Sequence, residues 1–175
     1  MANIRGKYHT VTVTPTCFAG LNVNGDSIFL PTEIPNACYS GGTSLLKSIR
    51  LFDKDDLGVD MNLLFFETKP TVETLGAAGA LFTIGGGGNN TDALVQRANP
   101  FGALLLDISE ITTFDYTGSQ IHFKNSIDMF VKSEPGEIDV DNDTGAYGSI
   151  YFMAFIVGTP TTAADSYTFQ FVFES

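Results

Sequence analysis

The sequence predicts an all-β protein, folded as a two-sheet antiparallel β-sandwich or a jelly-roll-like domain, with one short helix near residues 91–98. Three observations support this class: the composition, many short alternating segments, and an aromatic final strand. The 175 residues include 18 Gly, 15 Phe and 6 Tyr but no Trp. Aromatic residues favour strands and glycines favour turns. A chain of this length forms a single domain over residues 1–175, which leaves room for a short N-terminal arm over residues 1–7.

The first elements are short strands separated by turns. Residues 8–14 alternate between apolar and polar side chains, the pattern of a half-buried strand. Residues 17–23 and 27–30 are predicted as two further short strands around a tight turn at residues 24–26, where Asn and Gly accept positive φ. Residues 31–42 contain two prolines and two glycines, and they are predicted to form an ordered loop.

Two well-defined strands follow at residues 45–52 and 59–67. The six residues between them, Asp-Lys-Asp-Asp-Leu-Gly, form a polar turn that ends in glycine. This arrangement predicts a β-hairpin with a longer loop. Residues 63–66, Leu-Leu-Phe-Phe, are apolar at every position, so we expect a central strand that is covered on both faces.

The only predicted helix is at residues 91–98, with Thr91 as its N-cap and Asp92 in its first turn. Residues 134–148 form a polar, acidic segment that is predicted to be a loop. The strands predicted in this part of the chain are residues 103–108, 111–116, 120–123, 127–132 and 149–157.

The last strand has the clearest pattern. Four aromatic residues share one face, and they are Tyr167, Phe169, Phe171 and Phe173. Thr168, Gln170 and Glu174 lie on the opposite face. Because side chains alternate along a strand, this segment can bury its aromatic face against a second sheet.

The charge balance restricts the possible partners. Nine basic and 20 acidic residues give a net charge of −11, although only 17% of residues are charged and 43% are hydrophobic. Nucleic acids and anionic membranes attract clustered Lys and Arg, so neither partner is expected. Residues 1–14 have no apolar core, so we expect no secretory signal and a reducing compartment. Cys17 and Cys38 are therefore predicted to remain thiols and not to form a disulfide.

One acidic segment late in the chain is the candidate metal site. Asp139, Asp141 and Asp143 have the spacing of the first ligands in an EF-hand loop. Thr144 stands where that loop needs glycine, and Ile150 stands where it needs a bidentate glutamate. We therefore favour a solvated acidic turn over a Ca²⁺ site, and we expect no cofactor.

The other motifs do not define an active site. Residues 143–146, Asp-Thr-Gly-Ala, match the short signature of retropepsin-like proteases, but polar residues precede them where that family has a buried strand. The four glycines at residues 85–88 are not followed by the Gly-Lys-Ser/Thr of a phosphate-binding loop. His9 and His122 lie in alternating segments and are interpreted as ordinary strand residues. No catalytic residue is predicted, and a protease is a remote alternative.

Three stretches of the chain together carry a resemblance to a known family. They are residues 30–37 (LPTEIPNA), residues 45–56 followed by 62–66, and residues 155–161 leading into 168–174. Together they resemble small virion proteins of tailed bacteriophages that are encoded among the head genes. The Thr-Asp-Ala at residues 91–93 matches the start of a short helix in that family. The aromatic last strand and the long acidic segment depart from the family pattern.

The resemblance implies a capsid decoration or auxiliary head protein, which is not an enzyme. Its partner would be the lattice of the major capsid protein. The chain would then lie on the capsid surface of the virion, which is assembled in the host cytoplasm. A homo-oligomer is expected, with a trimer favoured. Its many weak contacts with a symmetric lattice would add up by avidity and so stabilise the contacts between capsomers. The alternative is a tail, fibre or adhesin module whose exposed aromatic residues bind a host surface glycan.

The predicted loop at residues 31–42 and the residue before it supply a candidate interface. Its apolar members are Leu30, Pro31, Ile34, Pro35 and Tyr39. Exposed apolar residues of this kind mark binding surfaces, so they could dock on a neighbouring protein. They could equally pack over one end of the sandwich, and the sequence leaves both interpretations open.

Overall fold

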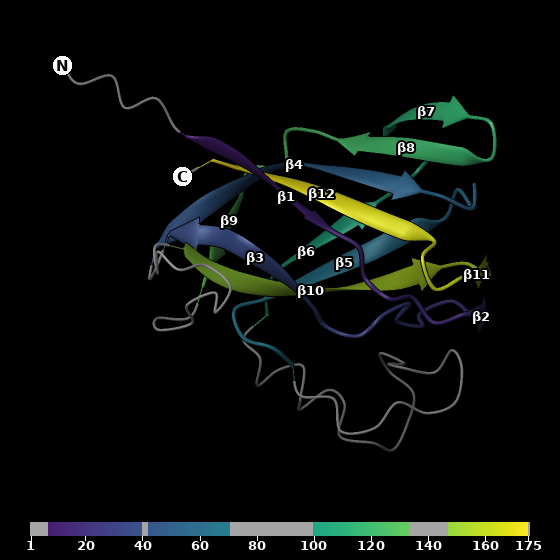
Figure 1. The fold of residues 1–175 in the computed structure, drawn as a ribbon, viewed down its shortest axis with the longest axis horizontal. Helices are drawn as coiled ribbons and strands as arrows, with labels where there is room; N and C mark the ends of the chain where they lie inside the picture. The colour runs from purple at the N-terminus through teal and green to yellow at the C-terminus, as the bar shows by residue number, and fades with distance from the viewer. Residues whose placement is uncertain (1–6, 40–41, 71–99, 134–146, 175) are drawn as a thin grey trace.

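The computed structural model describes residues 7–39, 42–70, 100–133 and 147–174 (Figure 1). Every regular element in these ranges is a β-strand, which confirms the all-β class. The helix predicted at residues 91–98 lies outside the described residues. The strands are β1 (Tyr8–Val13), β2 (Gly20–Leu21), β3 (Thr32–Tyr39), β4 (Thr43–Asp53), β5 (Asp60–Phe66), β6 (Pro100–Leu106), β7 (Thr112–Tyr116), β8 (Ser119–Lys124), β9 (Met129–Lys132), β10 (Tyr147–Val157), β11 (Thr161–Thr162) and β12 (Tyr167–Glu174).

The described strands form two main antiparallel sheets and one short ribbon. The first sheet has six strands in the order β1-β12-β4-β8-β7, with β9 also paired to β4. The second sheet has four strands in the order β3-β10-β5-β6. The ribbon consists of β2 and β11, which lie together at one end of the molecule (Figure 1).

β4 pairs with two different strands along one of its edges. Its residues 43–46 pair with β9, and its residues 49–53 pair with β8. β8 and β7 form a hairpin whose turn contains Gly118 at a φ of 79°. Every residue of β7 is exposed, so this hairpin forms a solvent-facing edge of the first sheet beside β4 (Figure 1).

The core lies between the first and second sheets. Tyr167, Phe169, Phe171 and Phe173 of β12 are fully buried, as the alternation of the last strand predicts. Phe171 meets Phe65 of β5 edge-to-face, with ring centroids 6.3 Å apart. Edge-to-face aromatic pairs bury apolar area and add specific contact energy, so these rings join the two sheets.

Most predicted strands are confirmed, with ends that move by up to three residues. The confirmed strands are those predicted at residues 8–14, 45–52, 59–67, 103–108, 111–116, 120–123, 127–132, 149–157 and 167–174. β10 begins at Tyr147, so the last two residues of the predicted acidic loop belong to a strand. The rest of that loop, residues 134–146, lies outside the described residues.

The loop predicted at residues 31–42 is wrong, because most of it is β3. Pro35 is tolerated there since β3 is an edge strand, where a missing N–H does not interrupt a ladder on both sides. Asn36 adopts a φ of 56°, and the pairing of β3 with β10 shifts register between Gly148 and Ile150. A bulge thus absorbs the irregular residues and lets the strand continue.

The hairpin predicted from residues 45–52 and 59–67 is also wrong. β4 belongs to the first sheet and β5 to the second, so the turn between them crosses from one sheet to the other. Both strands bury their apolar side chains in the same core, so the two strands must lie on opposite sides of that core. The central position expected for β5 is confirmed, because β5 lies between β10 and β6, and Phe66 is buried in a second apolar cluster with Met153.

The strands predicted at residues 17–23 and 27–30 are wrong as continuous strands. Only β2 forms there, together with isolated bridges at Cys17 and Ser27. The Asp26 carboxylate accepts a backbone N–H from three residues earlier at 2.9 Å. Such local side-chain bonds compete with ladder pairing, which explains the short strands.

Candidate functional site

A groove on the outer face of the first sheet is the candidate functional site. Its volume is about 450 Å³, which falls within the range of about 300–1,000 Å³ that small-ligand sites occupy. The strands β1, β12, β4, β8 and β7 all contribute side chains to it. Because the lining residues lie on paired strands or directly at their ends, the sheet holds the groove in a fixed shape.

One cross-strand row of side chains spans the groove from one wall to the other. Phe114 pairs with Ile121, Ile121 pairs with Phe52, and Phe52 pairs with Thr168. Directly opposed residues of antiparallel strands point to the same face, with Cβ atoms about 4.5–5.5 Å apart. Phe114 is 59% exposed and Tyr116, two residues further along β7, is 70% exposed. These two rings form an exposed aromatic wall along β7.

The opposite side of the groove is polar, and its side chains are held by hydrogen bonds. The Gln170 side-chain oxygen accepts a hydrogen bond from Arg50 at 2.8 Å, and its nitrogen donates to the Thr12 hydroxyl at 3.3 Å. The hydroxyl oxygens of Thr168 and Thr14 are 2.9 Å apart. This polar wall therefore combines an amide and hydroxyl groups in a set orientation.

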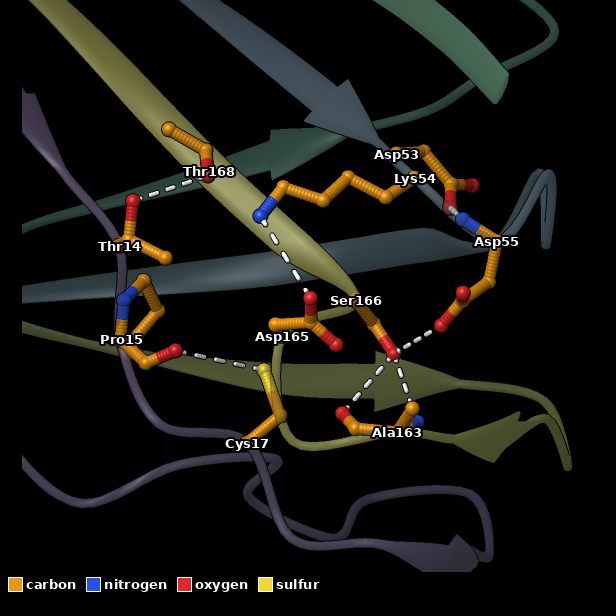
Figure 2. A network of polar contacts seen from close by, with 10 residues as sticks. All are labelled: Thr14, Pro15, Cys17, Asp53, Lys54, Asp55, Ala163, Asp165, Ser166 and Thr168. Atoms are coloured by element: carbon orange, nitrogen blue, oxygen red, sulfur yellow. Dashed lines mark hydrogen bonds and ion pairs between the residues drawn. The ribbon is translucent and has the colours of Figure 1, made fainter. Parts of the chain in front are cut away.

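Asp53 ends β4 and fixes the turn at one end of the groove (Figure 2). Its carboxylate accepts backbone N–H groups from Leu57 and Gly58 at 2.8 Å each, and from Asp55 at 3.3 Å. Burial raises the pKa of the Asp53 carboxyl above its ordinary value, and the hydrogen bonds to Gly58 and its neighbours oppose that rise. The carboxylate is thus engaged in holding the turn.

A second network ties this turn to the start of β12 (Figure 2). The Ser166 hydroxyl accepts the backbone N–H of Ala163 at 2.7 Å and lies 2.5 Å from the Asp55 carboxylate. The backbone N–H of Lys54 donates to the Ser166 carbonyl at 2.8 Å. The Lys54 ammonium reaches toward Asp165, with nitrogen and oxygen 3.9 Å apart. These contacts place Lys54 at the end of the groove.

His122 lies behind the groove and does not open into it. It is 1% exposed, and its Nδ1 is 2.9 Å from the Thr113 hydroxyl. Its Nε2 has no hydrogen-bond partner among the described residues. Burial lowers the pKa of His122, and the carboxylates of Asp53, Asp115 and Asp56 partly oppose this. His9 lies in β1 and His122 in β8, so the interpretation of both as strand residues is confirmed.

The residues of the sequence-based candidate interface do not share one environment. Leu30 is exposed, Pro35 is half-buried, and Pro31 and Ile34 are buried. Tyr39 is the last residue of β3. Ile34 belongs to the core cluster between the sheets, so its side chain is used in packing.

The sequence-based metal and protease candidates fall outside the described residues. Asp139, Asp141 and Asp143 all lie in the range 134–146. In the part of the chain that the structure describes, no group of three His, Cys, Asp or Glu side chains could hold a metal ion. The same part of the chain contains no helix that is long and apolar enough to cross a membrane.

Both cysteines are free and buried. Burial raises the pKa of the Cys17 thiol to about 11, and it raises the pKa of the Cys38 thiol equally, to about 11. A thiol with such a pKa contains little thiolate at neutral pH, so neither cysteine is a reactive nucleophile.

The groove was not predicted from the sequence, although one signal for it was present. The segment Thr112–Tyr116 has two aromatic residues at period two, as an outward aromatic face requires. The sequence could not show that this face lies beside Thr168 and Gln170, because that depends on which strands pair. No protein-family model, no curated protein and no solved structure matches the chain.

Proposed function

We propose that this chain is a non-enzymatic virion structural protein that binds the outer surface of a tailed-phage capsid and stabilises capsomer contacts. Its fold is a jelly-roll-like β-sandwich, and it acts as a homotrimer on the lattice of the major capsid protein. The nested order of its strand pairs is the observation that carries the proposal. The resemblance of three sequence stretches to phage head proteins supports it.

The strand pairs nest from the two ends of the described chain toward its middle. β1 pairs with β12, β2 with β11, β3 with β10, β4 with β8 and β9, and β5 with β6. Such nesting means that one long antiparallel ribbon is folded over itself, which is the jelly-roll principle. Jelly rolls are common in viral capsid domains and in lectins. Because a fold alone does not define a function, the proposal also needs a surface that can dock.

The end of the molecule beside the β2–β11 ribbon offers that surface, which we call the β2 end. It carries the exposed apolar side chains Leu21 (65% exposed), Val23 (52%) and Val157 (39%). The backbone N–H of Asn22 donates to the Pro160 carbonyl at 2.9 Å, which keeps the two segments side by side. Apolar side chains gathered on a surface mark interaction sites, and we assign these to the capsid contact.

Binding of the purified protein to capsids that lack it tests this proposal. Wild type should bind to saturation with a fixed copy number per capsid. The double variant Leu21→Asp with Val23→Asp should weaken binding by about tenfold or more, because it places charge in an apolar contact. Phe130→Asp is the matched control, since Phe130 is 72% exposed on β9, which lies at the other end of the molecule from β2 (Figure 1). A wild-type protein that does not bind contradicts the proposal, and equal loss in the control contradicts the assigned surface.

The trimer is tested separately in solution. A cyclic trimer presents three identical docking surfaces to a symmetry axis of the lattice, so weak contacts add up to stable attachment. Light scattering coupled to size-exclusion chromatography should give three times the monomer mass. A monomeric mass at capsid-binding concentrations contradicts the trimer.

A further inference from the structure

The groove on the first sheet has two unlike walls. Phe114 and Tyr116 form an exposed aromatic wall along β7, and Thr168 and Gln170 form a hydroxyl and amide wall along β12. The accessible lining of the groove is mostly apolar, with a few polar groups on its β12 side. A pyranose ring matches these unlike walls, because it has an apolar C–H face and a rim of hydroxyl groups. Binding sites for small ligands typically combine aromatic side chains with a few placed polar groups in this way.

The charge of the groove favours a neutral ligand. Two of its lining residues carry a formal charge, Lys54 and Asp53. The Asp53 carboxylate is 1% exposed and accepts backbone N–H groups of its own turn, so it offers little to a ligand. Lys54 has Asp165 as an exposed ion-pair partner. Since the whole chain has a net charge of −11, an anionic polymer would also be repelled.

We propose that this groove binds a neutral glycan that contains hexopyranose rings. One ring stacks on Phe114 and Tyr116 and bonds to Ser119, which pairs with Tyr116. A following ring reaches Thr168 and Lys54, because Thr168 is three strand spacings, about 14 Å, from Phe114. This site is independent of the capsid contact, because the groove lies on the first sheet and the proposed contact is at the β2 end. The protein therefore combines attachment to a particle with recognition of a neutral surface polysaccharide.

The site is formed before any ligand arrives. Tyr116 pairs with Ser119 across the tight β7–β8 turn, so its backbone is fixed at the hairpin end. Gln170 is held between Arg50 and Thr12 by two hydrogen bonds. Ordering side chains on binding reduces affinity. Because these side chains are already ordered, ligand binding should lose little affinity in this way. Two-torsion aromatic side chains such as Phe and Tyr keep that cost low.

Saturation-transfer NMR and titration calorimetry test the proposal on the full chain, with maltohexaose, cellohexaose and an array of neutral bacterial polysaccharides as probes. At least one neutral probe should bind saturably to wild type. Phe114→Ala and Tyr116→Ala should each weaken that binding by about tenfold or more, whereas Tyr116→Phe, which keeps the ring, should stay within about twofold. Phe130→Ala is the matched control, because Phe130 is 72% exposed on β9 and does not line the groove.

Three results would overturn the proposal. The first is the absence of binding to every neutral probe by the folded wild-type protein. The second is binding that Phe114→Ala and Tyr116→Ala leave unchanged while their thermal unfolding matches wild type. The third is equal or tighter binding of oligogalacturonate, which would exclude the neutral class. If these variants lose capsid binding and wild type binds no glycan, the groove is a protein contact and the glycan proposal fails.

Discussion

Phe152 of β10 stands edge-to-face on Phe171 of β12, with ring centroids 5.0 Å apart and an interplanar angle of 77°. β10 belongs to the second sheet and β12 to the first, so this contact joins the two sheets directly. Both side chains are fully buried. Phe169 makes a similar edge-to-face contact with Phe152 at 5.1 Å. The last strand of the chain thus supplies the rings that hold the sheets together.

Removal of the Phe171 ring should destabilise the protein strongly. Phe171→Ala deletes a fully buried ring and leaves a cavity, so the free energy of unfolding should fall by about 3–5 kcal/mol. Phe130→Ala is the control, because this ring is mostly exposed and surface substitutions change stability by about 0.5 kcal/mol or less. Urea unfolding followed by circular dichroism measures both. Equal effects of the two substitutions would contradict the packing described for β12.

Loss of the Asp53 carboxylate should weaken the turn between the sheets. Asp53→Ala removes the acceptor for three backbone N–H groups in a partly buried turn, which should cost about 1–3 kcal/mol of unfolding free energy. Asp165→Ala is the control, since its exposed ion pair with Lys54 contributes about 0–1 kcal/mol. Chemical denaturation of the two variants measures the difference. A smaller loss of unfolding free energy for Asp53→Ala than for Asp165→Ala would contradict the role of the Asp53 carboxylate in holding the turn.

Protonation of His122 should destabilise the fold. Burial holds the pKa of His122 below its ordinary value of 6.5, so the unfolded chain takes up this proton more readily than the folded protein. Stability contributed by neutral His122 is therefore present above pH 6.5 and is lost as pH falls from there toward the lower folded-state pKa. Thermal unfolding between pH 7.5 and pH 5 measures this loss.

Two variants test the His122 assignment. His122→Leu should flatten the pH dependence in that range, because the group that titrates is gone. His9→Gln should keep it, because His122 is still present. Identical pH dependence in His122→Leu and wild type would show that other groups cause the acid sensitivity. Asp53 has a raised pKa and gains protons with the opposite effect on stability, so it does not reproduce this pattern.

The two thiols should be protected in the folded protein. Cys17 and Cys38 are buried, and burial raises the pKa of each thiol to about 11. Reaction with a thiolate-specific reagent such as dithionitrobenzoate should therefore be slow in native buffer at pH 7.5 and should modify two thiols per chain in denaturant. Rapid labelling of the native protein, or fewer than two thiols in denaturant, would contradict buried free cysteines.

Local patterns in the sequence predict the strands well where one face is buried. β12 and β1 alternate cleanly because each packs one face on the core, and both were predicted from that alternation. β3 was missed because Pro35 and neighbouring turn residues favour a loop locally. The edge position and the bulge that tolerate them depend on pairing with β10, which is a tertiary property.

Strand partners are harder to predict than strands, and this explains why the groove was not foreseen. The turn after Asp53 fits a hairpin locally, but the two strands beside it enter different sheets. The groove needs Phe114 of β7 and Thr168 of β12 on one face, although 54 residues separate them in the sequence. Hydrophobic period alone carries no information on such long-range neighbours.

The proposal that this chain is a virion protein is tested most directly by its copy number and position in purified particles of a phage whose genome contains its gene. Quantitative mass spectrometry of the particles, together with cryo-electron microscopy, provides both. We expect a fixed, lattice-like copy number and density on the outer surface of the capsid. Absence of the protein from virions, or density only on the tail, would contradict it.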